Sequence, residues 1–401
     1  MSSGLPTCAR SVRHSRSNLP FTMNIVVPSR FQPSFGSLRP AAGTSFALID
    51  QIPVLFSDDE QKLFELNDVA AFIWCSMQNA VPLEAILDQL VNRGLSSTGA
   101  RESLRDALNQ WLSAGLIVPH IDTLNFAFCT VVGQRLVQIR ASDARVLDHL
   151  RSIFIATTAP KADAETIFAV HQAGNTSIVI HEGRKVLSCG TNELAPTFKA
   201  YITEQLLLTG DTRNVVFHAA AVVSGNRALL ISAPPGTGKS TLTMHLLNAD
   251  FGYAADDIVI IGPDGAIQGA PFAPTLKSAS WSLVSGFRPD VYSVTIHNRL
   301  DGQAVRYLNV EADVYKGPIR VNWIVFLERT SGGTPPTLRA LSELDTIRRI
   351  VGASFATHGK LTTESFHTLK KVASEVRSFV LRYAEAEGAT NKLIELCNGK
   401  L

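Results

Sequence analysis

The residues best suited to chemistry lie in a loop rich in glycine and proline, the stretch APPGTGKS at positions 233–240. The apolar run LLIS precedes this loop, and TLTMHLLN, which has the composition of a helix, follows it. Strand, loop and helix in this order form the context of the phosphate-binding motif G-x-x-x-x-G-K-[ST], here with Ala233 in place of the first glycine. Gly236 and Gly238 allow several backbone N–H groups to point at one anion. The stretch predicts binding of a nucleoside triphosphate.

The same motif predicts the contacts with ATP and Mg²⁺. Lys239 is expected to reach the β- and γ-phosphates, and the Ser240 hydroxyl is expected to bind Mg²⁺. The residues predicted to bind the nucleotide are Pro235, Gly236, Thr237, Gly238, Lys239, Ser240 and Thr241.

Two neighbouring carboxylates follow the loop helix, at Asp256 and Asp257 in the stretch FGYAADDIVII. Successive residues of a regular strand face opposite sides, so only one of the two is expected to point at the phosphates. Phosphoryl transfer needs one carboxylate for the metal and one to accept the proton of the attacking hydroxyl. We assign Asp256 to the metal and favour Asp257 as the base, although a simple metal ligand of an ATPase is an alternative for Asp256.

A histidine precedes the loop, in the strand-like run 215–223. The Gly225-Asn226 turn after this run predicts a hairpin that brings His218 beside the phosphate-binding strand. A histidine on an apolar strand can equally be a core residue. The order of His218, hairpin, loop and Asp pair resembles the catalytic domain of the HPr kinase/phosphorylase family, strongly over 213–262 and diffusely up to 401. This resemblance implies an α/β P-loop kinase domain in which His218, Lys239 and Asp257 line the catalytic site, and it suggests a ring-like or dimeric assembly.

One segment departs from that family. The bifunctional enzymes carry a downstream segment with a glutamate, rich in Arg and Gly, that serves both directions of the reaction, whereas positions 265–289 here contain no acidic residue. The departure argues against phosphorylase activity and against HPr as the substrate, and it suits related kinases of peptide maturation, including lasso-peptide kinases. Lys277 and Arg288 are candidates for balancing phosphate charge, or ordinary surface cations.

A second resemblance covers about 45–120. Three short β-like runs precede three helices with apolar stripes, the first helix capped by Asn67 and the third closed by Gly115. This winged-helix-like α+β pattern, with LFELNDVAAFIW at 63–74 and WLSAGLI at 111–117, resembles the PqqD family, a peptide recognition element for ribosomally made, modified peptides. The resemblance implies that a leader peptide adds as a strand to the edge near 60–66 and packs against the third helix. A DNA reader is the alternative, but the third helix balances Arg101 and Arg105 with Glu102 and Asp106.

The composition limits the classes of partner and the cellular compartment that are expected for this chain. A net charge of +2 argues against nucleic acid, and no apolar run approaches the ~18 residues of a membrane span. Five cysteines without C-x-x-C spacing favour a reducing cytoplasm over a disulfide framework or zinc site. Residues 1–44 are rich in Arg and Ser with no acidic residue, which predicts a disordered tail, a mis-called start with Met23 as initiator, or a transit peptide.

The predicted organisation is a tail at 1–44, a PqqD-like domain at 45–120, an α+β preface without recognisable chemistry at 121–212, and a kinase-like ATP domain at 213–401. The function predicted is ATP-dependent phosphorylation of a Ser or other hydroxyl on a captured precursor peptide or small protein. The alternatives are a non-catalytic peptide-delivery protein that binds ATP, a small-molecule kinase regulated by peptide, and, less favoured, a transcriptional regulator.

Overall fold

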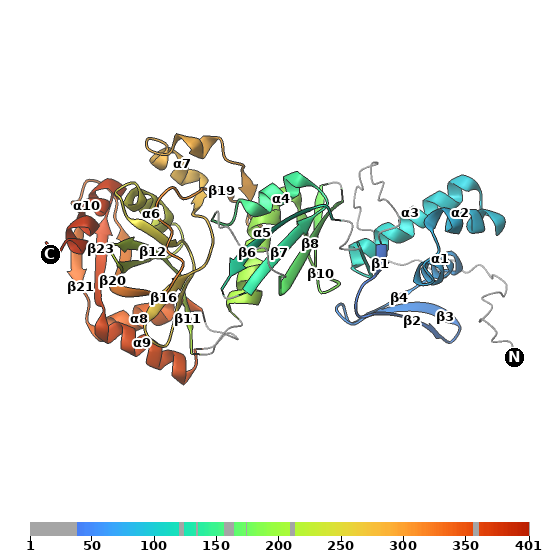
Figure 1. Ribbon diagram of the computed structural model, residues 1–401, viewed down its shortest axis with the longest axis horizontal. Coiled ribbons are helices and arrows are strands. Elements are labelled where there is room, and N and C mark those ends of the chain that lie inside the picture. Colours follow the sequence, from blue (N-terminus) through green and yellow to red (C-terminus); the bar gives the residue numbers. More distant parts are fainter. Residues whose placement is uncertain are drawn as a thin grey trace. The chain divides into compact units, whose positions relative to one another are not determined.

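A computed structural model describes residues 38–119, 124–133, 135–155, 164–173, 175–208, 213–355 and 361–400. The chain divides into two compact units (Figure 1). The first unit consists of Met1–Asn125, Arg140–Ser142 and Phe168–Ser188, and the second of Phe126–Ile139, Asp143–Ile167 and Cys189–Leu401. Met23 and most of the predicted tail lie outside the described residues.

The first unit contains the predicted three strands and three helices. The strands β2 (Thr44–Ile49), β3 (Ile52–Ser57) and β4 (Lys62–Glu65) form an antiparallel sheet in that order. The helices are α1 (Asp68–Gln78), α2 (Leu83–Asn92) and α3 (Ser97–Ala114). The predicted caps are confirmed, because the Asn67 side chain accepts the Ala70 N–H at 2.8 Å and Gly115 ends α3 with a φ of 74°.

This unit begins earlier than the boundary at residue 45 suggests. Strand β1 (Leu38–Pro40) pairs with β5 (Ile117–Pro119), and Ala41 is buried in the core. Residues 38–43 were therefore wrongly assigned to a disordered tail. Strand β1 is only three residues long and contains a proline, so its sequence shows no strand periodicity, and its assignment rests on the backbone pairing with β5.

The core of the first unit combines helices with a distant hairpin. Trp74 and Trp111 pack edge to face with ring centroids 5.2 Å apart. Ile178 and Ile180 belong to the same core and come from β9 (Thr176–His181), which pairs with β8 (Thr166–Ala173) and precedes β10 (Arg184–Gly190). The two isoleucines lie more than 50 residues beyond α3, so the core includes residues from the region predicted as preface.

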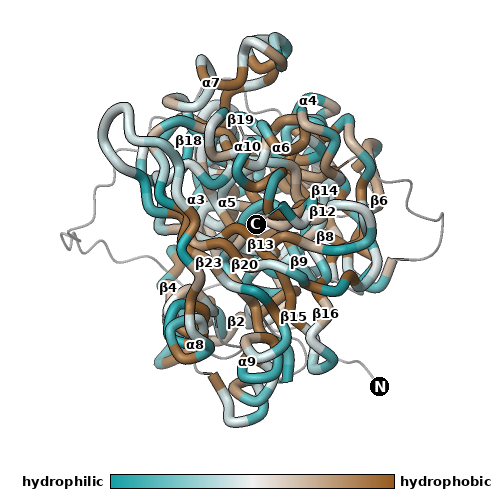
Figure 2. The backbone as a smooth tube through the Cα atoms, turned by 90° about the vertical axis from the view of Figure 1, so that its left-hand side faces the viewer, coloured by the Kyte–Doolittle hydropathy of each residue, from teal (hydrophilic) through white to brown (hydrophobic). Residues whose placement is uncertain are grey.

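The second unit is a layered α/β structure. Strands β13 (Arg227–Ser232) and β23 (Arg377–Tyr383) lie on either side of β20 (Ile319–Arg329), all three parallel. The central part of β20 is a nearly continuous apolar run, which is typical of a strand buried on both faces. Figure 2 shows β13, β20 and β23 largely in the hydrophobic colours.

Helices cover both faces of this sheet. On one face Leu229 and Ile231 pack with α6 (Lys239–Leu247) and α10 (Ala386–Cys397), and on the other face Leu230 packs with α8 (Glu343–Gly352) and α9 (Thr363–Glu375). The alternation along β13 follows the period of two of a strand. The remaining strands of this sheet are β11 (Val215–Phe217), β12 (Ala219–Ser224), β14 (Gly252–Ala255), β15 (Val259–Ile261), β16 (Ala266–Gly269), β21 (Thr337–Ala340) and β22 (Ser354–Phe355).

The second unit also contains β6 (Phe126–Val132), most of β7 (Arg135–Ala141) and the helix α4 (Ala144–Arg151). Helix α5 (Leu194–Ile202) belongs to it as well and continues as a π-helical segment, Thr203–Leu207. Strands β17 (Thr275–Lys277), β18 (His297–Asn298) and β19 (Ala304–Tyr307) form a small sheet beside α7 (Ser278–Val284). In the part of the chain that the structure describes, no helix is both long and apolar enough to cross a membrane.

Candidate functional site

The glycine-rich loop joins the end of β13 to the start of α6. Gly236 and Gly238 have φ values of 85° and 103°, a region that side chains rarely adopt. The Tyr383 hydroxyl donates to the Thr237 carbonyl at 2.6 Å, which fixes the loop from β23. The first N–H groups of a helix lack intrahelical acceptors and carry the positive end of its dipole. The loop is therefore suited to binding an anion at the N-terminus of α6.

Lys239 is buried at this N-terminus, with an exposed fraction of 8%. Its Nζ lies 2.9 Å from Asp257 Oδ1 and 2.9 Å from His218 Nε2. The site thus brings together the loop lysine, the histidine and one carboxylate that the sequence singled out.

The second carboxylate of the site, Asp256, contacts Ser240 and Thr275. The Ser240 hydroxyl donates to Asp256 Oδ2 at 3.0 Å, and the Thr275 N–H donates to the same oxygen at 3.0 Å. Burial raises the pKa of Asp256, and the charge of Asp257 raises it further, while Lys239 opposes both. A fully buried carboxylate beside a hydroxyl supplies the hard oxygen ligands that Mg²⁺ prefers, and Mg²⁺ commonly uses only one or two carboxylates. These residues fit such an ion, although the described residues hold no cluster of three or more His, Cys, Asp or Glu.

Both carboxylates face the loop, which contradicts the expectation from regular strand geometry. Strand β14 ends at Ala255, and Asp257 has a φ of 80°. The left-handed backbone at Asp257 breaks the alternation of side chains, so Asp256 reaches Ser240 while Asp257 reaches Lys239. Desolvation alone would raise the pKa of Asp257, but the ammonium groups of Lys239 and Lys199 hold it well below its usual range.

His218 lies at a break between two strands. The predicted hairpin is confirmed, since β12 pairs antiparallel with β13, but the single strand predicted over 215–223 is interrupted at His218. There the His218 N–H donates to the Ala353 carbonyl at 2.9 Å, and its own carbonyl accepts the Ser232 hydroxyl at 3.1 Å. Desolvation, followed by the charge of Lys239, lowers the pKa of His218 and favours the neutral ring. The break aims this ring at Lys239 rather than into the core.

Lys199 is a site residue that the sequence reading missed. It comes from α5, and its Nζ lies 2.9 Å from Thr275 Oγ1 and 3.6 Å from Asp257 Oδ2. One signal was present in the sequence. Lys199 occupies the apolar stripe of its helix with Ala195, Phe198 and Ile202, where a cation needs a buried partner.

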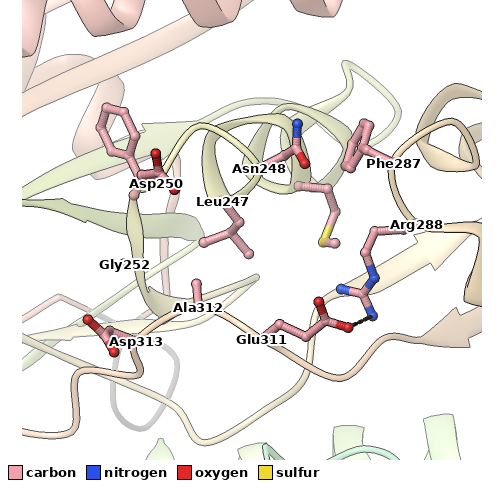
Figure 3. A pocket seen from close by; sticks show the side chains of 11 residues that line it. Leu247, Asn248, Asp250, Gly252, Phe287, Arg288, Glu311, Ala312 and Asp313 are labelled. Atoms are coloured by element: carbon pink, nitrogen blue, oxygen red, sulfur yellow. Dashed lines mark ion pairs between the residues drawn. The ribbon is translucent and has the colours of Figure 1, made fainter.

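The structure places Lys277 and Arg288, the two candidates for balancing phosphate charge, at different sites. Lys277 is close enough to His218 for its charge to lower the pKa of that ring. Arg288 instead donates to the Asp290 carboxylate at 2.7 and 2.8 Å and to the Asn309 carbonyl at 2.9 Å. It lines a different pocket, where Figure 3 shows it paired with Glu311. Arg288 therefore fits neither alternative, because its partners lie outside the loop and its side chain is buried rather than at the surface.

Two pockets are lined by residues that neighbour or contact the loop lysine. A pocket of about 600 Å³ is lined by Lys199, His218, Asp257, Tyr307 and, at an exposed turn, Leu300. A second pocket of about 310 Å³ is lined by Gly238, Thr241, His245, Arg329 and Tyr383. A ligand in the larger pocket can contact Asp257, whereas one in the smaller pocket can contact the loop.

Comparisons with known proteins give a family match for one part of the chain and a similarity to a solved structure. No curated protein matches it. Among solved structures, it is similar to one titled "Structure of the Hpr(Ser) kinase/phosphatase from Coxiella burnetii", at 11% identity over 46% of this chain and 94% of that chain, with a TM-score of 0.22. Residues 54–117 match the family described as coenzyme PQQ synthesis protein D (PqqD), which confirms the resemblance seen over about 45–120, and the first unit thus contains a PqqD domain.

Proposed function

We propose that this chain is an ATP-dependent kinase that phosphorylates a Ser, or another hydroxyl, of a ribosomally made precursor peptide or small protein captured by its PqqD domain. The observation that carries the proposal is the convergence of Lys239, Ser240, Asp256 and Asp257 at the N-terminus of α6, with a pocket open beside Asp257. The second unit is then a P-loop kinase domain.

Each residue has a distinct role in this proposal. The N–H groups of residues 235–241 bind the β- and γ-phosphates, and Lys239 moves its ammonium onto them. Ser240 and Asp256 hold Mg²⁺, which neutralises charge on the phosphate oxygens when it is bound. His218, neutral and in contact with Lys239, orients that lysine.

Asp257 is the proton acceptor in this reaction. The acceptor hydroxyl enters the larger pocket, and its oxygen forms a bond with the γ-phosphorus as the bond from that phosphorus to the bridging β–γ oxygen breaks. The hydroxyl proton goes to the Asp257 carboxylate, and ADP leaves. This assignment agrees with the burial of the two carboxylates. Asp256 is fully buried against Ser240, whereas 32% of the Asp257 side chain is exposed, toward the pocket.

The PqqD domain offers an edge for peptide binding. In the described part of the chain β4 pairs with β3 alone, which leaves its other side available for an added strand. Leu63 on β4 is 58% exposed, and Phe56 beside it on β3 is also exposed. An extended leader segment can gain main-chain hydrogen bonds from β4 and apolar contact from these side chains.

The test is transfer from γ-labelled ATP to precursor peptides encoded near the gene, read as the mass of an added phosphoryl group. Asp257→Asn should keep ATP binding but lower transfer by about 10²–10⁴-fold, the usual contribution of a general base. Lys239→Ala should lose ATP binding. Asp88→Asn, an exposed position on α2, is the matched control and should retain transfer.

Two outcomes would contradict the proposal. If Asp257→Asn retains full function while Lys239→Ala does not, ATP serves as a conformational switch for a delivery protein. If turnover occurs only with small hydroxy compounds and peptide leaves it unchanged, the chain is a small-molecule kinase.

A further inference from the structure

Only two lysines are buried among the described residues, and both contact the same carboxylate. Lys239 and Lys199 are each 8% exposed, and their Nζ atoms lie 2.9 Å from Asp257 Oδ1 and 3.6 Å from Asp257 Oδ2. Burying an ammonium group is costly unless it is paired and hydrogen-bonded. The second lysine therefore needs an explanation that the loop motif does not provide.

The surroundings of Lys199 are built to hold a cation. The ammonium donates to Thr275 Oγ1 at 2.9 Å and lies 5.2 Å from the ring centroid of Phe272 and 5.6 Å from that of Tyr307. Aromatic faces at such distances attract a cation. These contacts come from β17, β19 and the segment before β17, so α5 is anchored to three neighbouring parts of the second unit through one side chain.

Lys199 is also connected to the other carboxylate. Thr275, whose hydroxyl accepts from Lys199, donates its backbone N–H to Asp256 Oδ2 at 3.0 Å. One ammonium group thus contacts Asp257 directly and Asp256 through a single residue. No other described lysine has both connections.

The two lysines cannot have the same role during phosphoryl transfer. Lys239 begins α6, and a γ-phosphate at the loop competes with Asp257 for its ammonium. Lys199 approaches the other oxygen of Asp257 from α5, on the side of the larger pocket. We propose that Lys199 is a positioning residue that keeps the Asp257 carboxylate directed at the acceptor hydroxyl when Lys239 binds phosphate. This inference rests on the proposed function.

The test compares Lys199→Met, which removes the charge but keeps the length, with Lys199→Arg, which keeps the charge. Lys199→Met should lower kcat by about 10²-fold, the cost of a misplaced reacting group, while KM for ATP changes by less than about twofold. Lys199→Arg should recover most of kcat. Lys370→Met, the same substitution at an exposed position of α9, should match the unsubstituted chain.

A double substitution tests whether Lys199 acts through Asp257. Adding Lys199→Met to Asp257→Asn should lower kcat no further, because the group that Lys199 positions is already disabled. Losses that multiply would overturn the inference, and so would a Lys199→Met variant with unchanged kcat or with a raised KM for ATP alone.

The inference and the proposed function fail in different ways. If the unsubstituted chain transfers phosphate and Lys199→Met transfers it equally well, the inference fails and the function stands. If the unsubstituted chain modifies no peptide, the function fails. In that case the urea-unfolding midpoints of the two single variants and the double variant test the contact between Lys199 and Asp257. If the shifts in midpoint of the single variants add up to that of the double variant, the contact is rejected.

Discussion

Gly238 sets a narrow limit on the shape of the loop. Its φ of 103° is one constraint, and a Cβ at this position would lie 2.6 Å from the Tyr383 hydroxyl. Gly236 has a φ of 85°, but a Cβ there would meet nothing within 4 Å. An alanine substitution at either glycine therefore introduces backbone strain, but only the substitution at Gly238 adds a steric clash.

We expect Gly238→Ala to abolish nucleotide binding, because both the strain and the clash distort the loop. Gly236→Ala should weaken binding only roughly tenfold, since left-handed strain costs about 1–2 kcal/mol. Adding Tyr383→Phe to Gly238→Ala should restore part of the affinity, as the next atom of that ring is 3.9 Å away. Calorimetric titration with ATP measures all three, and equal losses for the two glycine variants would contradict this reading.

A second residue-scale prediction concerns acid stability. Glu328 on β20 accepts from Arg382 at 2.9 Å and from Arg349 at 3.0 Å, and these bonds lower its pKa from 4.5. Because the folded-state pKa is the lower one, the stabilisation is present above about pH 4.5 and is lost as the pH falls through the folded value. The free energy of unfolding of Glu328→Gln should thus approach that of the unsubstituted chain on acidification. A difference in the free energy of unfolding between the two proteins that stays constant with pH would contradict this prediction.

At the scale of elements, β4 offers a specific test of peptide capture. The Leu66 N–H donates to the Pro53 carbonyl. In an antiparallel pair every second residue bonds to the partner strand, so Phe64 also bonds to β3, whereas the N–H of Leu63 points to the free edge. Proline at position 63 removes that donor without breaking a bond to β3. Leu63→Ala keeps the donor and is the matched control.

Leu63→Pro should weaken leader-peptide binding about tenfold more than Leu63→Ala does, the effect of one or two lost main-chain hydrogen bonds. Fluorescence anisotropy with a labelled leader peptide measures it, and kcat at saturating peptide should not change. Equal affinities for the two variants would place the peptide elsewhere on the domain.

Most elements could be predicted from periodicity, but parts of the site could not. The apolar stripe of α2 and the caps at Asn67 and Gly115 depend on local sequence, which is why they could be predicted. The left-handed backbone at Asp257, the strand break at His218 and the pairing of β1 with β5 depend on tertiary contacts that leave no local pattern. Lys199 is intermediate, since its place on an apolar stripe was visible but its partner, Asp257, lies 58 residues away.

At the scale of the whole molecule, the proposed peptide recognition and the proposed chemistry are assigned to different units. The PqqD match falls in the first unit and the loop constellation in the second. If both act on one peptide, capture by the first makes the encounter with the second intramolecular.

Removing the leader from a substrate peptide should therefore raise its KM by about 10²–10⁴-fold and leave kcat unchanged. Steady-state kinetics with full-length and leaderless peptides measures both constants. A leaderless peptide with an equal loss in kcat would mean that the leader takes part in the reaction itself.

The contact between Lys239 and Asp257 carries one more consequence, for the order of substrate binding. While the ammonium holds Asp257 Oδ1, that oxygen is not available to an incoming hydroxyl. A triphosphate that draws Lys239 to the loop releases it. The site then favours an ordered mechanism in which the nucleotide binds first. Water that enters before the nucleotide finds the Asp257 oxygen still bonded to Lys239. Product inhibition by ADP should accordingly be competitive toward ATP and noncompetitive toward the peptide.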